Sequence, residues 1–444
     1  MNVLAKDYFD SIKNSIFNEL GPDEIVSIDI SGESSNFVRF NNSKVRQIGM
    51  VDDLSVSFSL ISNQRTMSFA STLSGDMETD MSNLLSNLNR IRKDINSIPE
   101  DPYIVYPTGD GSSFSEKSGD LLSPEKVVPT LTPVISDLSL TGIWSSGRIF
   151  TGNSNSLGQE HWFESDSFSL DYSLIASGER MLKGTYAGTS WDGAEFLDRI
   201  NGDRYKLDIL TKDPVEIKPG KYRTFIESAG VSDLVSMFSW GGISESSIQQ
   251  AESSLCKMRS DSIKLSPCFS LSEDFKGGSV PRFNSNGEVA PERLDLIVSG
   301  SLKNTLVSSN TSKEYKVESN FAERGEYLRS PYMGSGELDN SDVLSELGTG
   351  LYLSNLHYLN WSDRIGGRVT GMTRYACFWV EDGKLVSPIK DMRFDDSIYN
   401  FFGDSLEDAT KNVTFNPNVG TYNGRSLGGT HCPGILLSSF EMTL

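Results

Sequence analysis

The sequence has few residues that bind transition metals, with three histidines and four cysteines among 444 residues. His161, His357 and His431 are far apart in the chain, so no two of them have the spacing of a metal-binding helix face. The cysteines show neither close pairing nor zinc-finger spacing, and their number is low for an extracellular chain. We therefore expect reduced thiols in a cytosolic protein.

Basic residues are scarce relative to acidic ones: 40 Lys and Arg against 60 Asp and Glu give a formal charge of −20. A nucleic-acid backbone or an anionic membrane would repel this charge, so neither is an expected partner. No apolar run approaches the roughly 18 residues of a membrane span, and the first ten residues contain acids and lack the apolar core of a signal peptide. These absences predict a cytoplasmic protein.

The motifs of several enzyme classes are also missing. The chain has no Gly-x-Ser-x-Gly elbow for a serine nucleophile and no Gly-x-x-x-x-Gly-Lys loop for a phosphate. Serines are abundant, but serine richness is typical of turns. The acidic residues are dispersed rather than spaced like phosphates, so an acidic mimic of DNA ranks last among the possible functions.

The length and the hydrophobic content of 37% are sufficient for two cores. Proline and glycine interrupt the pattern twice between residues 206 and 220, at Asp213-Pro214 and at Lys218-Pro219-Gly220. We therefore predict an N-terminal domain over residues 1–205 and a C-terminal domain over residues 206–444.

The N-terminal part alternates between helical and strand periodicity. Apolar residues recur at helical spacing in residues 4–20 and 76–95, and Ser123-Pro124 marks the start of another helix. Between the first two helices we predict an antiparallel meander with a hairpin around Asn41-Asn42-Ser43. A loop over residues 103–120, a second sheet segment over 141–175 and a helix over 191–200 complete this domain.

The C-terminal part is centred on residues 348–403. Strand residues up to Val380 stop at Asp382-Gly383 and resume at Lys384, which predicts a hairpin with a left-handed turn. We expect residues 350–353 and 366–371 to join it in a meander, and a short helix to follow Asp395. The predicted fold class is α+β, with antiparallel sheets, helices packed on one face, and a strand-rich, barrel-like C-terminal domain.

Several motifs in this chain resemble a known family. They are Gly-Arg-Val-Thr-Gly-x-Thr-Arg at 367–374, Phe-Trp-Val-Glu-Asp-Gly-Lys at 378–384 and Pro-Ile-x-x-x-Arg-Phe at 388–394. Residues 37–47 and the Asn-Ser-Leu-Gly at 155–158 agree with them. The pattern is similar to the TldD/PmbA proteins, once called modulators of DNA gyrase, and in particular to the PmbA (TldE) branch. The gyrase-related name does not imply DNA binding, given the acidic charge.

The resemblance implies a peptidase. TldD-type members hold zinc with a His-Glu-x-x-x-His helix and a distant cysteine. In this chain the helix in the corresponding place, predicted over residues 231–240, contains no histidine, cysteine or glutamate, and Asp233 alone cannot hold zinc. We therefore expect a subunit without a metal or catalytic residues of its own, paired as a heterodimer with a TldD-like zinc subunit that acts on unfolded or leader peptides.

Two other functions remain open. The chain could be a peptidase that is active by itself through an unrecognised site. By number alone, the three histidines and Cys432 would be enough ligands for a dispersed metal site. It could also be a stand-alone peptide-binding regulatory protein. His431 and Cys432 are adjacent, so in a strand they point to opposite faces and could not easily share one ion.

Four polar residues near the central hairpin are candidates for substrate binding, because they could bind the carbonyl groups or the carboxylate of a peptide. They are Arg368, Thr373, Arg374 and Arg393. The alternative is local salt bridging with Asp363, Glu381 or Asp395.

Overall fold

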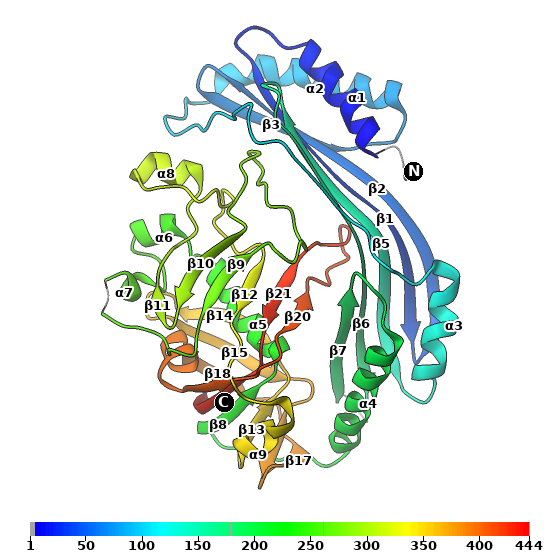
Figure 1. Ribbon diagram of the computed structural model, residues 1–444, viewed down its shortest axis with the longest axis vertical. Helices are drawn as coiled ribbons and strands as arrows, with labels where there is room; N and C mark the ends of the chain where they lie inside the picture. The colour runs from blue at the N-terminus through cyan, green and yellow to red at the C-terminus, as the bar shows by residue number, and fades with distance from the viewer. Residues whose placement is uncertain (1–4, 177–179, 261, 444) are drawn as a thin grey trace.

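Three sheets organise the computed structural model, which describes residues 5–176, 180–260 and 262–443. The first sheet has seven strands in the order β3-β2-β1-β5-β6-β4, with β7 also paired to β6. Four of its strands are unusually long, at 16 to 19 residues, and curve around the C-terminal domain (Figure 1). The strands are β1 (Ile25–Asn41), β2 (Lys44–Ser62), β3 (Arg65–Thr72), β4 (Ser113–Lys117), β5 (Leu140–Asn155), β6 (Glu160–Ile175) and β7 (Met181–Gly188).

Helices cover the outer face of this sheet near its two ends. In β1, Val26, Ile28 and Ile30 share a core with α1 (Ala5–Asn18) and α2 (Met77–Asp94). On the same face, Val38 and Phe40 share a core with α3 (Pro124–Ile135) and α4 (Gly193–Leu210). Because side chains alternate along a strand, the residues between these positions point to the inner face. No helix in the described ranges is long and apolar enough to cross a bilayer.

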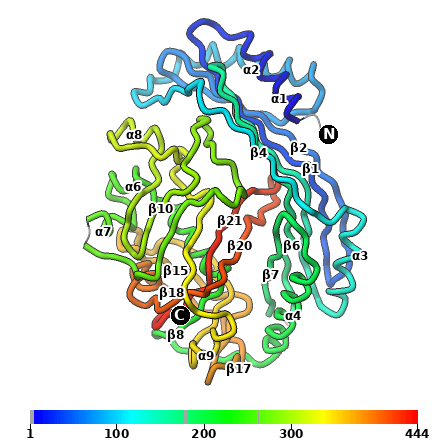
Figure 2. Tube along the Cα trace, viewed as in Figure 1, coloured from blue at the N-terminus to red at the C-terminus, as the bar shows by residue number. Residues whose placement is uncertain are grey.

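The C-terminal half contains the other two sheets. A nine-stranded sheet forms a curled half-barrel, and a six-stranded sheet lies between it and the long strands (Figures 1 and 2). The nine strands are β8 (Gly220–Ile226), β13 (Gly350–Leu353), β14 (Asn355–Asp363), β15 (Arg368–Arg374), β16 (Phe378–Glu381), β17 (Lys384–Pro388), β18 (Arg393–Ser397), β19 (Leu406–Ala409) and β22 (Ile435–Met442). The six are β9 (Leu271–Asp274), β10 (Arg293–Val298), β11 (Ser301–Leu302), β12 (Pro331–Met333), β20 (Thr414–Pro417) and β21 (Gly429–Cys432).

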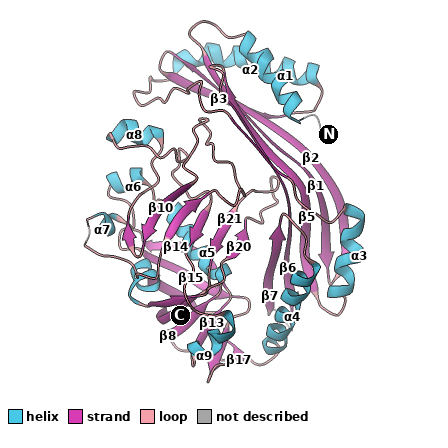
Figure 3. Cartoon of the chain, in the orientation of Figure 1, coloured by secondary structure: helices cyan, strands magenta, loops and turns pink. Residues whose placement is uncertain are grey.

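Helices are short in this half, as the cartoon coloured by secondary structure shows (Figure 3). Helix α5 packs Val231, Leu234 and Val235 into the largest apolar core of the domain. The helices are α5 (Ser228–Ser236), α6 (Glu245–Gln249), α7 (Cys256–Arg259), α8 (Ser309–Tyr315) and α9 (Val343–Leu347).

Polar contacts join the inner face of the long strands to the C-terminal domain. The His161 ring stacks on Phe283, and its Nε2 lies 2.8 Å from the carbonyl oxygen of Gly287. Asn153 donates from Nδ2 to the Asp29 carboxylate at 2.7 Å and to the Ser285 carbonyl at 3.3 Å. These hydrogen bonds, whose geometry must be maintained, form one part of the seam between the two halves. The other part is an apolar core that α4 shares with Phe378 and Leu385 of the half-barrel.

Several predictions from the sequence are confirmed. The fold is α+β with a barrel-like C-terminal region. Helices occupy the first two predicted segments, and Asp76 caps α2 by accepting from the Thr79 N–H. Asn42 and Ser43 have positive φ in the β1–β2 hairpin, as do Asp382 and Gly383 between β16 and β17. All four cysteines are free.

Other predictions were wrong in detail. The second sheet segment predicted over 141–175 is present as β5 and β6, but it continues the sheet of the meander, because β5 pairs with β1 along most of its length. Strand β4 lies within the predicted loop 103–120, and α4 continues to Leu210, so the connection between the halves begins only there. The predicted meander is absent: β13 pairs with β8 and β16, whereas β15 pairs with β14 and β18. Gly366-Gly367 belongs to the turn that joins β14 to β15.

We predict that Gly287→Ala destabilises the fold, because Gly287 lies in the seam between the two halves. Gly287 has φ +78°, and a Cβ there would lie 2.2 Å from Gln159 Oε1 and 2.7 Å from Asn153 Oδ1. We expect the substitution to lower the free energy of unfolding by about 1–3 kcal/mol, because a left-handed conformation is strained for alanine and the seam must shift. The measurement is urea denaturation. Gly277→Ala is the control, since a Cβ at Gly277 meets nothing within 4 Å; equal effects of the two would contradict the account.

Candidate functional site

Helix α5 and the thiol of Cys432 form a polar cluster where three distant parts of the chain meet. Strand β8 leads directly into α5, and Cys432 of β21 lies against its first turn, with Sγ 3.2 Å from the Ser228 carbonyl oxygen. Ser228 Oγ donates to the Cys432 carbonyl at 2.8 Å. Asn416 of β20 donates from Nδ2 to Ser228 Oγ at 2.7 Å. The α5 cluster is therefore held by hydrogen bonds between hydroxyl, amide and thiol groups.

The electrostatics of the α5 cluster do not favour a cation. Burial raises the pKa of the Cys432 thiol to about 12, so the sulfur is protonated at neutral pH and is not a thiolate. Burial also raises the pKa of Asp233, in the next turn of α5, to about 7. Serine, asparagine and a neutral thiol do not match the imidazole, thiolate and carboxylate ligands of zinc. Within the described residues, no group of three or more His, Cys, Asp or Glu could hold a metal ion.

The three histidines have separate surroundings. Both ring nitrogens of His161 already have partners, because Nδ1 lies 2.7 Å from Ser113 Oγ and Nε2 lies against Gly287. The His431 ring packs on Phe415, with ring centres 4.6 Å apart, while the adjacent Cys432 is buried on the opposite side of the strand. This arrangement agrees with the expected opposition of these two side chains.

The candidate substrate-binding residues divide between two faces of the half-barrel. Arg368 and Arg374 lie at the two ends of β15 and share a face, and Arg393 joins it because it pairs with Met372. Thr373 points the opposite way: it is 1% exposed and its Oγ1 accepts from the Met392 N–H. His357 of β14 is also opposite Met372 and shares the arginine face.

The arginines differ in their partners. Arg368 donates from Nε to Asp395 at 2.8 Å, which is one of the local salt bridges considered as an alternative. Arg393 donates to Thr370 Oγ1 at 3.3 Å. The Arg374 guanidinium lies 5.2 Å from the centre of the Tyr375 ring. Substrate binding by this face stays a prediction.

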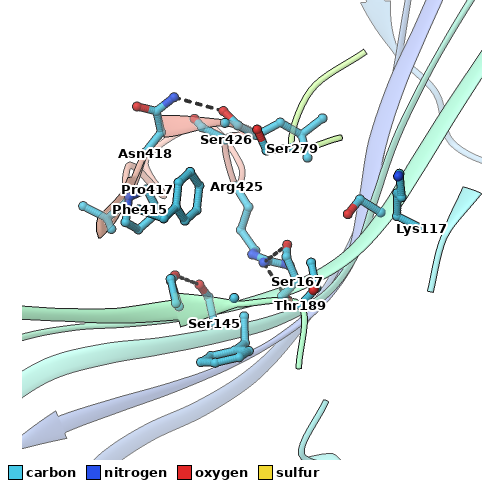
Figure 4. Close-up of a pocket in the computed structure, with 18 of the residues that line it drawn as sticks. Lys117, Ser145, Ser167, Thr189, Ser279, Phe415, Pro417, Asn418, Arg425 and Ser426 are labelled. Carbon is cyan, nitrogen blue, oxygen red and sulfur yellow. Dashed lines mark hydrogen bonds between the residues drawn. The ribbon is translucent and has the colours of Figure 1, made fainter. Parts of the chain in front are cut away.

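A cavity of about 360 Å³ lies between the inner face of the long strands and the C-terminal segment around β20 and β21. Serines of β5 and β6 form its floor, and Arg425 reaches from the C-terminal segment across to Ser167 (Figure 4). Arg425 donates to the Ser167 carbonyl at 2.8 Å and to the Gly147 carbonyl at 3.1 Å. Lys117, at the end of β4, also lines this inner cavity.

Sequence reasoning did not identify the residues of the inner cavity. Arg425 is an isolated arginine in a segment of glycine, asparagine and serine, and Lys117 lies within the region 103–120 that was predicted as a loop. Neither belongs to a recognisable motif. The available signal was the alternation of small polar residues in Ser165, Ser167 and Ser169, which indicated a polar strand face but not its neighbour.

Comparisons with known proteins give one family and one fold. Residues 219–444 match the model of the PmbA/TldA metallopeptidase C-terminal domain. TldE from Thermococcus kodakarensis is 14% identical with a TM-score of 0.75, and the match covers 98% of this chain and 100% of that chain. No curated protein sequence matches the chain.

Two further solved structures are described as candidate modulators of DNA gyrase. The protein from Thermotoga maritima is 16% identical with a TM-score of 0.74, and the match covers 98% of this chain and 100% of that one. The protein from Bacteroides thetaiotaomicron is 15% identical with a TM-score of 0.75, and the match covers 99% of this chain and 98% of that one. At these identities the likeness shows a shared fold.

The buried carboxyl of α5 predicts a pH dependence of stability. The pKa of Asp233 is about 7 in the folded chain, against an ordinary value of 3.8, so the folded state retains this proton to higher pH than the unfolded state. Its stabilising contribution is complete below pH 3.8 and is lost as the pH rises through 7. We therefore expect the stability of Asp233→Asn relative to wild type to increase as the pH rises from 3.8 to about 7.

Urea denaturation at several pH values measures this difference. Asp213→Asn is the matched control, because it removes the same charge from an exposed site between the two halves. A difference between Asp233→Asn and wild type that does not change with pH would contradict the assignment.

Proposed function

Because the chain belongs to the PmbA/TldD family, we propose that it is the TldE-type subunit of a TldD/TldE-type metalloprotease complex. Its partner is a TldD-type subunit that carries the zinc ion, and the complex cleaves unfolded or leader peptides. The composition of helix α5 is the observation that carries this proposal.

A zinc-binding helix of the TldD type needs two histidines four residues apart, so that both rings point to the same side. It also needs a glutamate that activates the bound water. Ser228, which contacts Cys432, is followed four residues later by Ser232. Serine is not among the usual ligands of zinc. The chain therefore has a thiol in the α5 cluster, but it has neither the imidazoles nor the glutamate of the family's metal helix.

The likeness to TldE from Thermococcus kodakarensis supports the same subunit type, because it extends over 98% of this chain. A subunit that binds no metal can still contribute to catalysis if it helps to enclose the substrate of its partner. An enclosed chamber of this kind admits unfolded peptides and excludes folded proteins.

The half-barrel offers a surface for such a peptide. Strand β14 is at the edge of the nine-stranded sheet and pairs only with β15 in the described part of the chain. An extended peptide can add to such an edge through main-chain hydrogen bonds, which tolerate many sequences. The neighbouring arginine face, with Arg374 and Arg393, supplies donors for carbonyl or carboxylate groups of the peptide.

Co-expression with a TldD-type protein that contains His-Glu-x-x-x-His tests the proposed function. We expect the two chains to elute together in size-exclusion chromatography, with zinc content close to one per pair. The pair should cleave an unfolded peptide, and a chelator should abolish cleavage. This chain alone should show neither stoichiometric zinc nor cleavage.

The matched control is the same pair with alanine in place of the first histidine of the partner's motif. This pair should still assemble, but it should lose zinc and activity. Stoichiometric zinc and peptide cleavage by this chain alone would overturn the proposal in favour of an autonomous peptidase. Failure to bind any TldD-type chain, with retained peptide binding, would favour a stand-alone regulatory protein.

The arginine face predicts an effect on substrate affinity. Arg374→Gln removes a positive charge whose side chain rests on Tyr375 and is joined to no carboxylate by a salt bridge in the described residues. We expect it to raise KM of the complex for peptide roughly three- to tenfold, equivalent to about 1 kcal/mol, with little change in kcat. Arg324→Gln, at an exposed site elsewhere in the C-terminal half, is the control. An unchanged KM in Arg374→Gln would contradict the role of this face.

A further inference from the structure

The inner cavity is bordered by the free edges of two strands. In the described part of the chain, β7 pairs only with β6 and β20 pairs only with β21. Both strands line the cavity, β7 through Ala187 and Gly188 and β20 through Phe415 and Pro417. A free strand edge presents main-chain N–H and C=O groups that can pair with an extended segment. The two edges can therefore accommodate an extended segment beside the cavity.

The cavity walls carry positive charge and no negative charge. Lys117, Arg425 and His431 line it, without any aspartate or glutamate. Burial lowers the pKa of His431 below its ordinary 6.5, so this ring is neutral near pH 7. The charge of the lining is therefore that of Lys117 and Arg425, in a chain whose net charge is −20.

The charge of Arg425 has only neutral hydrogen-bond partners. Its guanidinium donates to the carbonyl oxygens of Gly147 and Ser167 and to the hydroxyls of Ser167 and Ser35. The nearby Glu33 carboxylate instead accepts the main-chain N–H of Arg425 at 2.9 Å. Within the described residues no salt bridge joins a carboxylate to Arg425 or to Lys117. Burial lowers the pKa of Arg425 to about 10, although the nearby charge of Glu33 acts to raise it.

An anion in the cavity would compensate the positive charge of Arg425. Carboxylate and guanidinium groups attract each other more strongly in a partly desolvated site than in water. Ser145 and Ser169 on the floor share a hydrogen bond of 2.9 Å between their hydroxyls, which leaves one O–H of the pair to donate to an anion. A cavity of about 360 Å³ holds a few residues of an extended chain but no folded partner.

We propose that the inner cavity, between Lys117 and Arg425, binds the C-terminal carboxylate of an extended peptide. The main chain of this peptide lies along the free edges of β7 and β20. This inference rests on the proposed function, since it names a feature of the peptide substrate that this subunit recognises. Free carboxylates and inorganic anions share part of the same chemistry, and the experiment separates them.

Isothermal titration calorimetry of the full chain tests the inference with two probes, acetyl-tetraalanine with a free C-terminal carboxylate and the same peptide as its C-terminal amide. We expect the free acid to bind at least tenfold more tightly than the amide. Lys117→Gln and Arg425→Gln should each reduce this preference to less than threefold. Arg425→Lys, which keeps the charge, should retain part of it.

The matched control is Lys276→Gln, which removes an equal charge from an exposed residue just outside the cavity. Its preference for the free acid should equal that of the wild type. If Arg425→Gln displaces the C-terminal segment, its effect on binding has a structural cause. Lys117 is exposed and has no role in a core, so Lys117→Gln still tests whether the charge at the cavity binds the carboxylate.

Three results would overturn the inference: equal affinity for acid and amide, no binding of either peptide, or acetate or inorganic phosphate competing as strongly as the free peptide. Different results would contradict the proposed function. A chain that assembles with a zinc subunit but ignores the carboxylate contradicts only the cavity assignment. A chain that prefers the free acid but pairs with no zinc subunit contradicts only the subunit assignment.

Discussion

The strict alternation of side chains along four long strands is the constraint on which the rest of this structure depends. A strand such as β1, with 17 residues, must present every second side chain to each face. Its apolar residues pack under α1 and α2 near one end and under α3 and α4 near the other. The opposite face is therefore free to be polar, and the C-terminal half contacts it through polar groups. Apolar residues of the C-terminal half, such as Phe378 and Leu385, also share the core under α4.

The polar part of the seam restricts the relative positions of the two halves more closely than apolar packing would. Buried polar groups need hydrogen-bond partners, so contacts such as His161 with Gly287 and Asn153 with Ser285 allow few relative positions of the two halves. Where partners do not fill the space, a cavity remains, lined by serines and basic residues together with apolar groups such as Phe168 and Phe415. Arg425 spans this cavity and fastens the C-terminal segment to Ser167. The same contact that positions the segment also places a positive charge beside the inner face.

The α5 cluster joins distant parts of the chain around a buried thiol. Strand β8, helix α5 and Cys432 bring a thiol against the first turn of a helix, although these parts are far apart in the sequence. Burial keeps that thiol and the Asp233 carboxyl mostly protonated at or below neutral pH. A site of neutral donors stabilises the fold by hydrogen bonds, and the proposed complex assigns the charged chemistry to the other subunit.

Local signals predicted local structure well. The Asp76 cap, the left-handed turn residues Asn42 and Asp382, and the amphipathic helix after residue 4 each depend on neighbours within a few positions, so the sequence alone determined them. The α+β class and the family resemblance were likewise available from the sequence.

Only the tertiary structure decided which strands are neighbours and which side chains share a surface. The pairing of β5 with β1, the separation of β13 from β15, and the approach of Arg425 to Ser167 each join residues distant in sequence. The opposite orientations of Arg374 and Thr373 followed from alternation once the strand was known, but which of the two faces is buried did not. Strand order and burial depend on how the whole chain excludes water from its apolar faces, and no short motif encodes that choice.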